Sequence, residues 1–499
     1  MKTLSKRELR WIIASLCALA AIRVFVFAAA FPFFNNVDEQ AHVDLVVKYA
    51  HGTPPHGIVT FSPEAALYFA VYSSPEYFVP PDQYGGQYPP PNWLLPRDQV
   101  EKVLQNEVPF WESRSNHESG EPPLYYAIGG AWFDFGRTLG LRGLVLLYWV
   151  RFLNIAFAAA LVWVGYKAAL IVFGDRSFPA ITTATLLAIW PQSSFYSVQG
   201  DSLSTVTFGL AFIAVARLLE SERPAVWLGV STGLAVAATC LIKTANLPLL
   251  LVVFAAVIYK AAILVRARAM QRAISILTAF LISVFVPLAL WAVWNQQHFG
   301  DLTATNSKIE LLGWTPKAFA DWWSHPIFTP AGAKNFWVEL IASFWRGEFI
   351  WHHERMAGWW SDAFYWSAST IVLVIVLVGL FIRRKSESNQ AVLWIAVFSF
   401  ASLVGFLVLL SIRFDFGECP YPSRENPFFT SGRLLNAAAV PFFVLFAYAI
   451  EQLASWTKRE WIRWGLLVLT IILVTTWQLS INSSAFSSGY NFFHHSAPQ

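Results

Sequence analysis

The stretch of sequence between residues 247 and 294, LPLLLVVFAAVIYKAAILVRARAMQRAISILTAFLISVFVPLALWAVW, decides the fold class. It contains two apolar runs, and each run is long enough as a helix to cross about 30 Å of hydrocarbon. The connector between them is short, and the basic residues of the stretch lie between Lys260 and Arg272. Two apolar runs joined by a short basic turn are typical of a polytopic membrane protein, whose cytoplasmic loops carry an excess of Lys and Arg.

The composition of the whole chain agrees with this pattern. Apolar residues make up 56% of the 499 residues, whereas Asp, Glu, Lys and Arg together make up 13%. An average soluble domain carries about 25% charged residues, so a soluble fold of this size could not cover its surface. Trp (24) and Phe (42) are abundant, as expected where aromatic rings line the membrane interfaces. The composition therefore excludes a soluble enzyme, a nucleic-acid-binding protein and a disordered scaffold.

The apolar segments predict an all-α protein with about eleven transmembrane helices. The segments begin near residues 11, 143, 178, 201, 225, 246, 273, 365, 391, 433 and 464. If the N-terminus is cytoplasmic, every second connector is short and basic, as the positive-inside rule requires. These connectors contain Arg176, Arg223, Lys260–Arg272, Arg383–Lys385 and Lys458–Arg463. The first apolar run lacks a small-residue cleavage site after it, so we expect a retained helix and not a signal peptide.

The same topology predicts two large regions outside the membrane. They cover residues 32–142 and 295–364, with a smaller outer loop at 413–432. We therefore divide the chain into an N-terminal transmembrane module at 1–294, the second outer loop at 295–364 and C-terminal helices at 365–499. The apolar segment 124–139 is short and contains two charges, so we expect it to lie flat at the outer interface. Loops of such length are usually functional.

The first outer region opens with two acids close to the membrane edge, in the sequence Asn35-Asn36-Val37-Asp38-Glu39-Gln40-Ala41-His42. Asn36 and Glu39 have the spacing of a capping box, and a helix is expected to start here. An apolar stripe at helical spacing follows between Val43 and Ala50, and it is suited to the membrane surface. An acid at position 39 can be explained equally well by stabilisation of the helix N-terminus and by a catalytic role. Stabilisation explains the acid at position 38 less well, because one acid would suffice for it. Asp38 is therefore the leading catalytic candidate.

Further ionisable residues lie towards the same side of the membrane. Asp201 stands at the start of an outer hairpin, where helix capping explains it as well as a catalytic role. Arg151 lies inside the second span and needs an acid or a phosphate as partner, because an unpaired charge in the membrane is costly. Lys243 can instead extend its amine to the interface. The stretch His352–Glu354 has no recognised metal spacing, and the sequence contains no Walker, HExxH, GxGxxG or CxxC motif.

The order of the motifs along the chain carries a resemblance. The elements are Asp38–His42 after the first span, Pro122-Pro123-Leu124-Tyr125-Tyr126, Arg151, Asp201, Leu241-Ile242-Lys243-Thr244, Ser343-Phe344-Trp345-Arg346-Gly347 and Ser431-Gly432-Arg433-Leu434-Leu435. In this order they resemble the GT-C superfamily of integral-membrane glycosyltransferases, most closely the branch with protein O-mannosyltransferases and aminoarabinose transferases. One element departs from the pattern. Relatives often have a His two residues before the Pro-Pro-Leu-Tyr-Tyr motif, where this chain has Gly120, and His117 is out of register.

The resemblance implies an enzyme that transfers a sugar from a polyprenyl-phosphate carrier to an acceptor outside the cytoplasm, with inversion at the anomeric carbon. It implies that Asp38 is the base and that Asp201 and Glu39 are further catalytic acids. The residues expected to bind the donor phosphate are Arg151, Lys243, Arg346 and Arg433, and those expected to bind the substrate are His42, Tyr125 and Tyr126. No cofactor is certain, although a divalent metal such as Mg or Mn could bridge Asp38 and Asp201.

Several alternatives stay open at this point. The acceptor could be a lipid, an envelope glycan or a protein Ser or Thr. The expected location is a bacterial cytoplasmic membrane with the active site facing outside, since the sequence ends without an endoplasmic-reticulum retention signal. The chief alternative function is a transporter or flippase of lipid-linked sugars, and such proteins usually show inverted repeats and short loops. A third alternative is a non-catalytic membrane subunit. The long outer loops and the acids gathered at one surface favour the enzyme.

Overall fold

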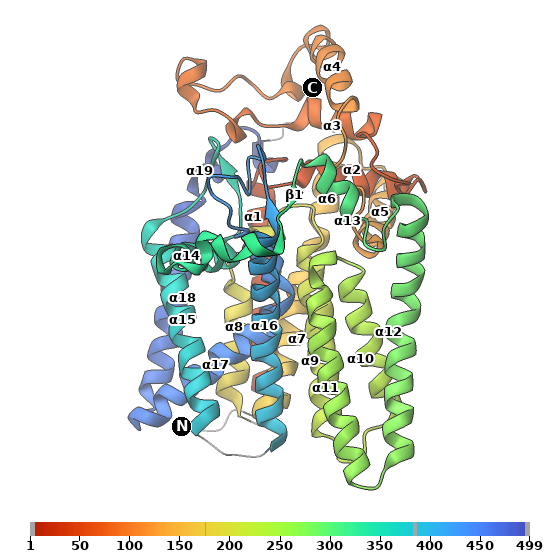
Figure 1. Cartoon of the computed structure of the whole chain (residues 1–499). Helices are drawn as coiled ribbons and strands as arrows, with labels where there is room; N and C mark the ends of the chain where they lie inside the picture. Colours follow the sequence, from red (N-terminus) through yellow and green to blue (C-terminus); the bar gives the residue numbers. More distant parts are fainter. Residues whose placement is uncertain (1–4, 175, 383–386, 495–499) are drawn as a thin grey trace.

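The apolar segments of the sequence form a bundle of long helices, and the large connections between them build a cap at one end (Figure 1). The computed structural model describes residues 5–174, 176–382 and 387–494. Within these residues the strands are limited to four pieces of two residues each. The prediction of an all-α polytopic membrane protein is therefore confirmed.

Each predicted span corresponds to a helix of the bundle. Among the described residues, nine helical stretches are long and apolar enough to cross a membrane, and two shorter apolar helices accompany them. The helices are α1 (Lys6–Ala30), α6 (Gly143–Arg151) with α7 (Leu153–Phe173), α8 (Ser177–Ile189), α9 (Asp201–Glu220), α10 (Val226–Cys240), α11 (Leu247–Arg266), α12 (Met270–Phe299), α15 (Trp359–Ile382), α16 (Glu387–Arg413), α17 (Ala439–Thr457) and α18 (Trp461–Ile481).

The two shorter helices, α8 and α10, determine where polar residues enter the bundle. They have 13 and 15 residues, which at 1.5 Å per residue gives about 20 and 23 Å, less than the roughly 30 Å of a hydrocarbon core. The segment 190–200, with a 3₁₀ turn at Ser193–Tyr196, follows α8 and is buried throughout. The segment 241–246, with a 3₁₀ turn at Thr244–Asn246, follows α10. Irregular backbone at membrane depth is tolerated only where protein or a water-filled cavity surrounds it. These two segments place Asp201 and Lys243 inside the protein.

Helix α17 occupies the interior of the bundle, where it contacts α8, α15 and α16. Most of its side chains are buried. Large aromatic side chains fill the space between α17 and the cap. Trp345 of the cap stacks on Tyr365 with ring centroids 5.2 Å apart, and it meets Phe443 of α17 edge-on at 5.3 Å. This aromatic packing holds the second outer connection firmly against the helix bundle.

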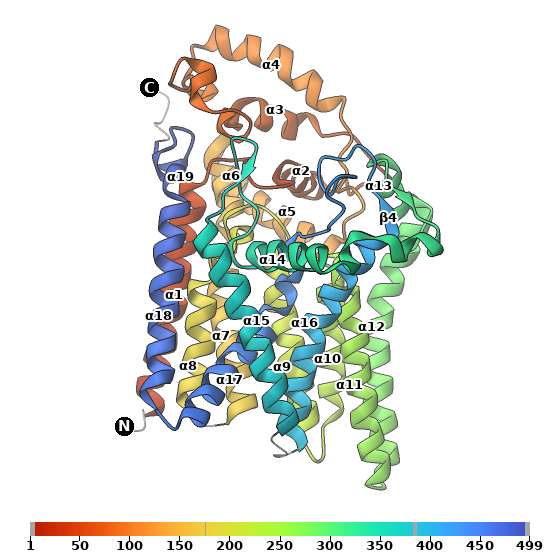
Figure 2. The ribbon, with the colours of Figure 1, turned by 60° about the vertical axis from the view of Figure 1, so that its left-hand side comes forward.

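The cap is helical as well. The first large connection forms α2 (Glu39–Ala50), α3 (Pro63–Tyr72), α4 (Arg97–Glu112) and α5 (Pro123–Thr138), with 3₁₀ turns at Pro75–Tyr77, Pro81–Tyr84 and Asn92–Leu94. The second connection forms α13 (Thr305–Leu311), 3₁₀ turns at Phe319–Ser324 and Pro326–Phe328, and α14 (Pro330–Arg346). Helix α14 lies across the end of the bundle (Figure 2). Strand β1 (Thr315–Pro316) pairs antiparallel with β4 (Phe414–Asp415), and β2 (Ile350–Trp351) with β3 (Glu354–Arg355). The last described elements are α19 (Ser483–Ser487) and a 3₁₀ turn at Phe492–His494.

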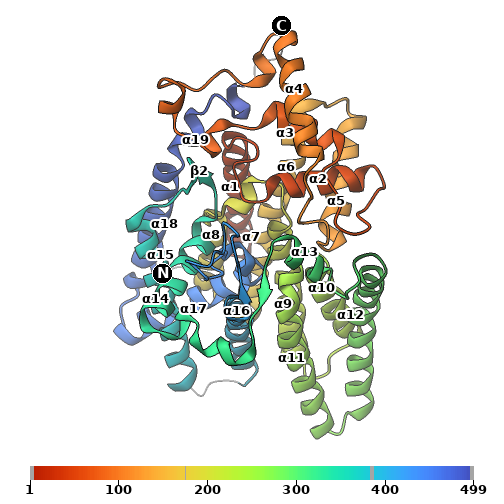
Figure 3. The ribbon, with the colours of Figure 1, turned by 45° about the horizontal axis from the view of Figure 1, so that its top comes forward.

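Helices α2 and α5 pack against each other in the cap (Figure 3). As predicted for residues 124–139, α5 is not among the candidate spans. The two helices approach closely because Gly130 has no side chain, and an added Cβ there would lie 2.7 Å from the backbone nitrogen of Ala50. The apolar residues Val43, Val46 and Val47 of α2 are all buried. The prediction that this stripe lies on the membrane is therefore wrong, since α5 and the rest of the cap cover it.

The turns of the bundle that lie opposite the cap carry the basic connectors. They join α7 to α8, α9 to α10, α11 to α12 and α17 to α18 (Figures 1 and 2). The basic residues of these turns include Arg176, Arg223, Arg266, Arg268, Lys458 and Arg459. The remaining predicted connector, Arg383–Lys385, lies outside the described residues. The described part of the chain thus separates its short basic turns from its large connections, as the sequence predicts.

Candidate active site

Asp38 lies in the turn between α1 and α2, and its side chain does not cap the helix. Its backbone has φ of 63°, which is uncommon for a residue other than glycine. Helix α2 begins at Glu39 as predicted, but the predicted capping box is wrong. The side-chain amide of Asn36 donates instead to Ser197 Oγ at 2.6 Å, and the Glu39 side chain is buried. The Asp38 carboxylate is therefore available to contact other parts of the chain.

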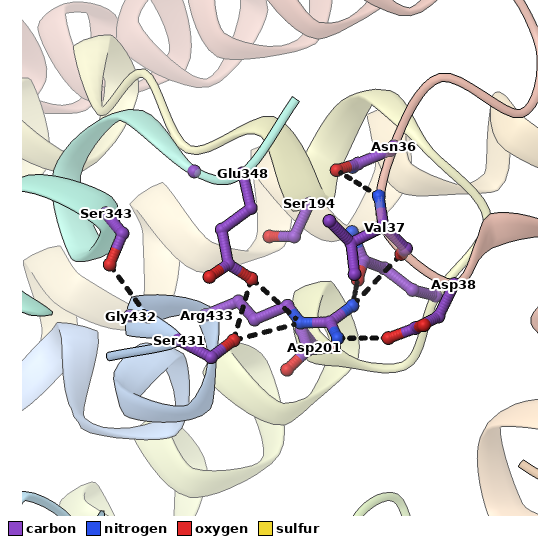
Figure 4. Close-up of polar contacts among 12 residues, drawn as sticks. Asn36, Val37, Asp38, Ser194, Asp201, Ser343, Glu348, Ser431, Gly432 and Arg433 are labelled. Atoms are coloured by element: carbon purple, nitrogen blue, oxygen red, sulfur yellow. Dashed lines mark hydrogen bonds and ion pairs between the residues drawn. The ribbon is translucent and has the colours of Figure 1, made fainter. Parts of the chain in front are cut away.

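The Asp38 carboxylate forms an ion pair with Arg433 (Figure 4). Arg433 belongs to the 3₁₀ turn Gly432–Ala438, directly before α17. Its Nη1 also donates to the backbone carbonyl of Val37 and to Oε1 of Gln199, at 3.1 Å each. Three segments that are distant in the sequence, the starts of α2, α9 and α17, therefore meet at one guanidinium group.

A second acid, Glu348, contacts the same arginine from the segment after α14. Arg433 Nε lies 3.2 Å from Glu348 Oε2, and the Ser431 hydroxyl donates to that oxygen at 2.7 Å. Figure 4 shows Asp38, Glu348 and Asp201 around Arg433. The sequence analysis did not predict Glu348 as a site residue, although Glu348 directly follows the Ser343–Gly347 motif. Gly347 allows the close approach of this segment, because a Cβ there would lie 2.0 Å from Ser193 Oγ.

His117 and Glu118 complete the surroundings of Asp38 from the segment before α5. His117 Nε2 lies 3.1 Å from Asp38 Oδ1 and 3.4 Å from Glu118 Oε1. Among the described residues, Asp38, His117 and Glu118 form a group whose potential ligand atoms all lie within 4.8 Å of one another. Two carboxylates and an imidazole suit a divalent cation such as Mn²⁺ or Mg²⁺. Asp201, the predicted second metal ligand, is not part of this group, since it pairs with Lys243.

The charges around this group keep its two acids ionised. Burial by itself raises the pKa of Asp38, but the Arg433 guanidinium and His117 together hold it well below its usual range. Burial also raises the pKa of Glu118, but Lys308 and His117 bring it below its usual value. The pKa of His117 is raised, because its hydrogen bond to Asp38 and the charge of Glu118 outweigh burial. The two acids are therefore negative at neutral pH, as ligands of a cation must be.

Asp201 and Lys243 form a second ion pair inside the site. Lys243 Nζ lies 2.6 Å from Asp201 Oδ2, and each residue is less than a tenth exposed. Asp201 is the first residue of α9, and its side chain does not cap the helix. The prediction of an exposed capping residue at this position is therefore wrong. Because α8 and α10 end early, both residues lie within the protein instead of at its outer surface.

His42 lies one turn after Asp38 and close to the charges of the site. Its Nδ1 is 2.7 Å from the hydroxyl of Tyr126, while its Nε2 is buried and has no hydrogen-bond partner among the described residues. Burial lowers the pKa of His42 to about 4, and the charges of Glu118, Lys243, Asp38 and Arg433 act on it in opposite directions. The imidazole is therefore neutral at pH 7 and offers one free nitrogen. Tyr125 is also buried and packs near Gly200, directly before Asp201.

Glu39 and Arg151 are buried, and they pair with each other. Arg151 Nη2 lies 2.8 Å from Glu39 Oε1, and each residue is 1% exposed. The carboxylate also accepts hydrogen bonds from the backbone N–H groups of Phe34 and Val198, at 3.0 and 2.9 Å. The other N–H groups of Arg151 donate to the carbonyls of Ala28, Phe31 and Pro32. The predicted roles of Arg151 in phosphate binding and of Glu39 in catalysis do not fit this arrangement, which leaves neither group free.

Two other predicted residues also have partners elsewhere. Arg346 pairs with Asp362, with Nε 2.9 Å from Oδ1, and its Nη1 donates to the Gly347 carbonyl. Its side chain therefore has no free donor nitrogen for a phosphate. His352 and His353 form the turn of the β2–β3 hairpin, with φ of 54° and 65°. Neither belongs to the cation-binding group found among the described residues.

Comparison with known proteins gives one family match. The family model described as "Predicted membrane protein (DUF2142)" matches residues 22–414. No curated protein matches the chain. Among solved structures, the chain is similar to the apo oligosaccharyltransferase of Archaeoglobus fulgidus, with 12% identity, a TM-score of 0.44 and coverage of 96% of this chain and 56% of that one. For the same enzyme with Zn and sulfate, the identity is 12%, the TM-score is 0.41 and the coverages are 94% and 53%. The chain thus spans about half the length of these structures.

Proposed function

The chain belongs to the DUF2142 family of predicted membrane proteins, and we propose that it is a membrane glycosyltransferase. In this proposal it takes a sugar from a polyprenyl-phosphate carrier and transfers it to an acceptor outside the cytoplasm. The proposal combines the geometry of the site with the resemblance of the motifs to GT-C enzymes. The observation that carries it is the meeting of Asp38, His117, Glu118 and Arg433 at one end of an apolar bundle. Buried ionisable groups in such a protein are costly and indicate function.

The cations of the site suit the departure of a phosphate. An apolar carrier enters from the lipid, so its phosphate reaches the protein near the end of the bundle. Arg433 and Lys243 each pair with an acid, and a phosphate can replace that acid as partner. Fixed positive charge at a developing anion is usually the largest catalytic contribution. A divalent cation held by Asp38, His117 and Glu118 would supply further positive charge to the leaving phosphate.

We assign the role of base to Asp38. The acceptor hydroxyl is a poor nucleophile, and a carboxylate helps by taking its proton. With Arg433 at one oxygen and His117 at the other, the lowered pKa makes Asp38 a weak base. When Arg433 turns to the donor phosphate, one oxygen of Asp38 becomes free to accept the hydroxyl proton, and the loss of the neighbouring guanidinium raises the pKa of Asp38. A direct attack of the acceptor on the face opposite the phosphate then inverts the anomeric carbon.

We place the site outside the cytoplasm. The basic turns of the described bundle lie at the end opposite the cap (Figure 1), and loops rich in Lys and Arg stay in the cytoplasm. The cap and the site are then extracytoplasmic. A bacterial cytoplasmic membrane fits this arrangement, since polyprenyl-phosphate sugars there are used on the outer side.

The proposal is tested with purified protein and a panel of radiolabelled polyprenyl-phosphate sugars, incubated with cell-envelope extract. We expect transfer of label from one donor to an envelope component, and loss of transfer when a chelator removes divalent cations. No transfer from any donor would contradict the proposal. Movement of the intact lipid-linked sugar across proteoliposomes, without transfer, would instead support a transporter or flippase.

A further inference from the structure

A cavity of about 360 Å³ lies beside the candidate active site, between α12 and the segment that precedes α5. Its volume falls within the range of about 300–1,000 Å³ that is typical of small-molecule sites. Pro287, Leu290, Trp291 and Trp294 of α12 form one side. Residues 119–121 form another part of the lining.

The wall at residues 119–121 is continuous with the cation-binding group, because it directly follows His117 and Glu118. Lys308 joins the two, since its Nζ lies 2.6 Å from Glu118 Oε2 and 3.8 Å from Glu121 Oε1. Gly120 packs tightly on the segment before α13, where an added Cβ would lie 2.7 Å from the Cβ of Ala304. The cavity wall therefore has a fixed position next to the reacting groups.

The two sides of the cavity differ in polarity. On α12 the lining runs from Pro287 to Phe299, thirteen residues that rise about 18 Å along the helix axis, and all of it belongs to a candidate span. This side is apolar and aromatic except for Asn295. The polar side chains of the lining include Tyr49, Ser119, Glu121 and Asn295. A ligand that matches the cavity has an apolar part within the span and a polar part near Glu121.

The lining offers no basic side chain to a phosphate, since no Lys or Arg is among the residues that line the cavity. Glu121 is the acidic residue of the lining. A carboxyl group forms hydrogen bonds with hydroxyls. The apolar faces of sugar rings can pack on the rings of Trp291 and Trp294, which also adjoin the cavity. The donor phosphate belongs with Arg433 and Lys243, and the cavity suits an uncharged group rich in hydroxyls.

We infer that this cavity binds the acceptor, and that the acceptor is a saccharide carried on a lipid. The inference rests on the proposed transfer reaction. A polypeptide or a free glycan would leave the apolar wall of α12 without an apolar partner, whereas a lipid chain buries it. In the reaction an acceptor hydroxyl oxygen forms a bond to the anomeric carbon of the donor sugar. The bond from that carbon to the phosphate oxygen breaks, the phosphate leaves with the electron pair, and Asp38 takes the hydroxyl proton.

The test is photo-crosslinking of the full chain in lipid nanodiscs. The probe is a dodecyl glucoside with a diazirine in its alkyl chain, and the labelled peptides are identified by mass spectrometry. We expect label on residues 287–299. Glu121→Gln and Trp291→Ala should each reduce the label about tenfold, as the loss of a hydrogen bond or a ring contact worth about 1.4 kcal/mol predicts. Glu107→Gln and Trp360→Ala, at exposed positions outside the cavity lining, should leave it unchanged.

Two comparison probes can overturn the inference. If dodecanol with the same diazirine labels residues 287–299 as strongly as the glucoside does, the cavity does not recognise a saccharide. If a diazirine-bearing polyprenyl phosphate labels them in place of the glucoside, the cavity belongs to the donor.

Transfer assays separate this inference from the proposed function. Transfer to a peptide but not to an alkyl glycoside would refute a saccharide acceptor and keep the glycosyltransferase. Specific labelling by the glucoside without transfer from any donor would keep the saccharide site and refute the transfer reaction.

Discussion

Replacement of Arg151 by Met removes the cation that faces the buried carboxylate of Glu39. In the wild type, this carboxylate is 1% exposed and accepts hydrogen bonds from Arg151 and from two backbone N–H groups. Removal of one partner of a buried ion pair costs about 3–5 kcal/mol, because the other charge stays buried without compensation. We therefore expect Arg151→Met to lower the free energy of unfolding by about 3–5 kcal/mol, a large part of the stability of an ordinary domain.

A second variant separates two contributions to the change in the free energy of unfolding, the loss of the ion pair and the loss of the packing of the Arg151 side chain. In Glu39→Gln/Arg151→Met no buried charge remains, and the glutamine oxygen can still accept from a backbone N–H group. Replacement of a buried pair by neutral residues is often close to neutral, so this double variant should recover most of the lost stability. The matched control is Arg137→Met, which breaks an exposed pair with Asp134 at 3.9 Å. Exposed pairs contribute about 0–1 kcal/mol.

The assay is unfolding of the purified protein in mixed micelles by increasing SDS, followed by circular dichroism. It compares Arg151→Met, the double variant and Arg137→Met with the wild type. If the free energy of unfolding of Arg151→Met lies within about 1 kcal/mol of the wild-type value, the ion pair does not hold α2 against α6. If the double variant is less stable than Arg151→Met, the loss does not come from an uncompensated Glu39 charge.

Three further predictions concern the site and the topology. Arg433→Ala should weaken equilibrium binding of a polyprenyl-phosphate sugar in nanodiscs by about tenfold or more, because a charge-assisted contact is lost; an unchanged dissociation constant would contradict this. His117→Ala should weaken Mn²⁺ binding, measured by electron paramagnetic resonance of free Mn²⁺, by about tenfold or more; wild-type affinity would remove His117 from the cation-binding group. In a Cys419→Ser background, a membrane-impermeant maleimide should label Gln87→Cys on intact cells but not Arg268→Cys, and the reverse pattern would invert the topology.

The fold could be predicted from hydropathy almost to the level of single helices, because each apolar run of the sequence forms one helix except the run from residue 143, which forms α6 and α7. The ends of α8 and α10 have local signals as well, because Pro191 disfavours a helical conformation at Trp190 and Lys243 interrupts the apolar run after Cys240. The burial of the segments that follow these helices could not be predicted. It depends on contacts with distant segments, such as the hydrogen bonds from the Gln192 side chain to the carbonyl groups of Ser343 and Phe344 at 3.2 and 2.8 Å.

The candidate site could be predicted only where residue type and motif order are informative. Asp38, Lys243 and Arg433 are such residues. The role of His117 depends on a loop that folds back onto α2. There the Asn116 amide donates to the Ala41 carbonyl at 3.0 Å and to Asp44 Oδ2 at 2.7 Å. Nothing in the local spacing of the sequence indicates these contacts.

The pairing of Arg151 with Glu39 could not be predicted either. It joins residues 112 positions apart. The sequence shows that each charge needs a partner, but it does not show which one.

The most direct test of the proposed function compares transfer by wild type, Asp38→Asn and Asp98→Asn under the same conditions. Asp98 is an exposed acid on α4, in the same outer connection as Asp38. With the donor identified from the panel, we expect Asp38→Asn to lower the rate of sugar transfer by about 10²-fold or more, because it loses the proton acceptor and a ligand of the cation. Asp98→Asn should keep the wild-type rate. Full activity of Asp38→Asn would contradict the account.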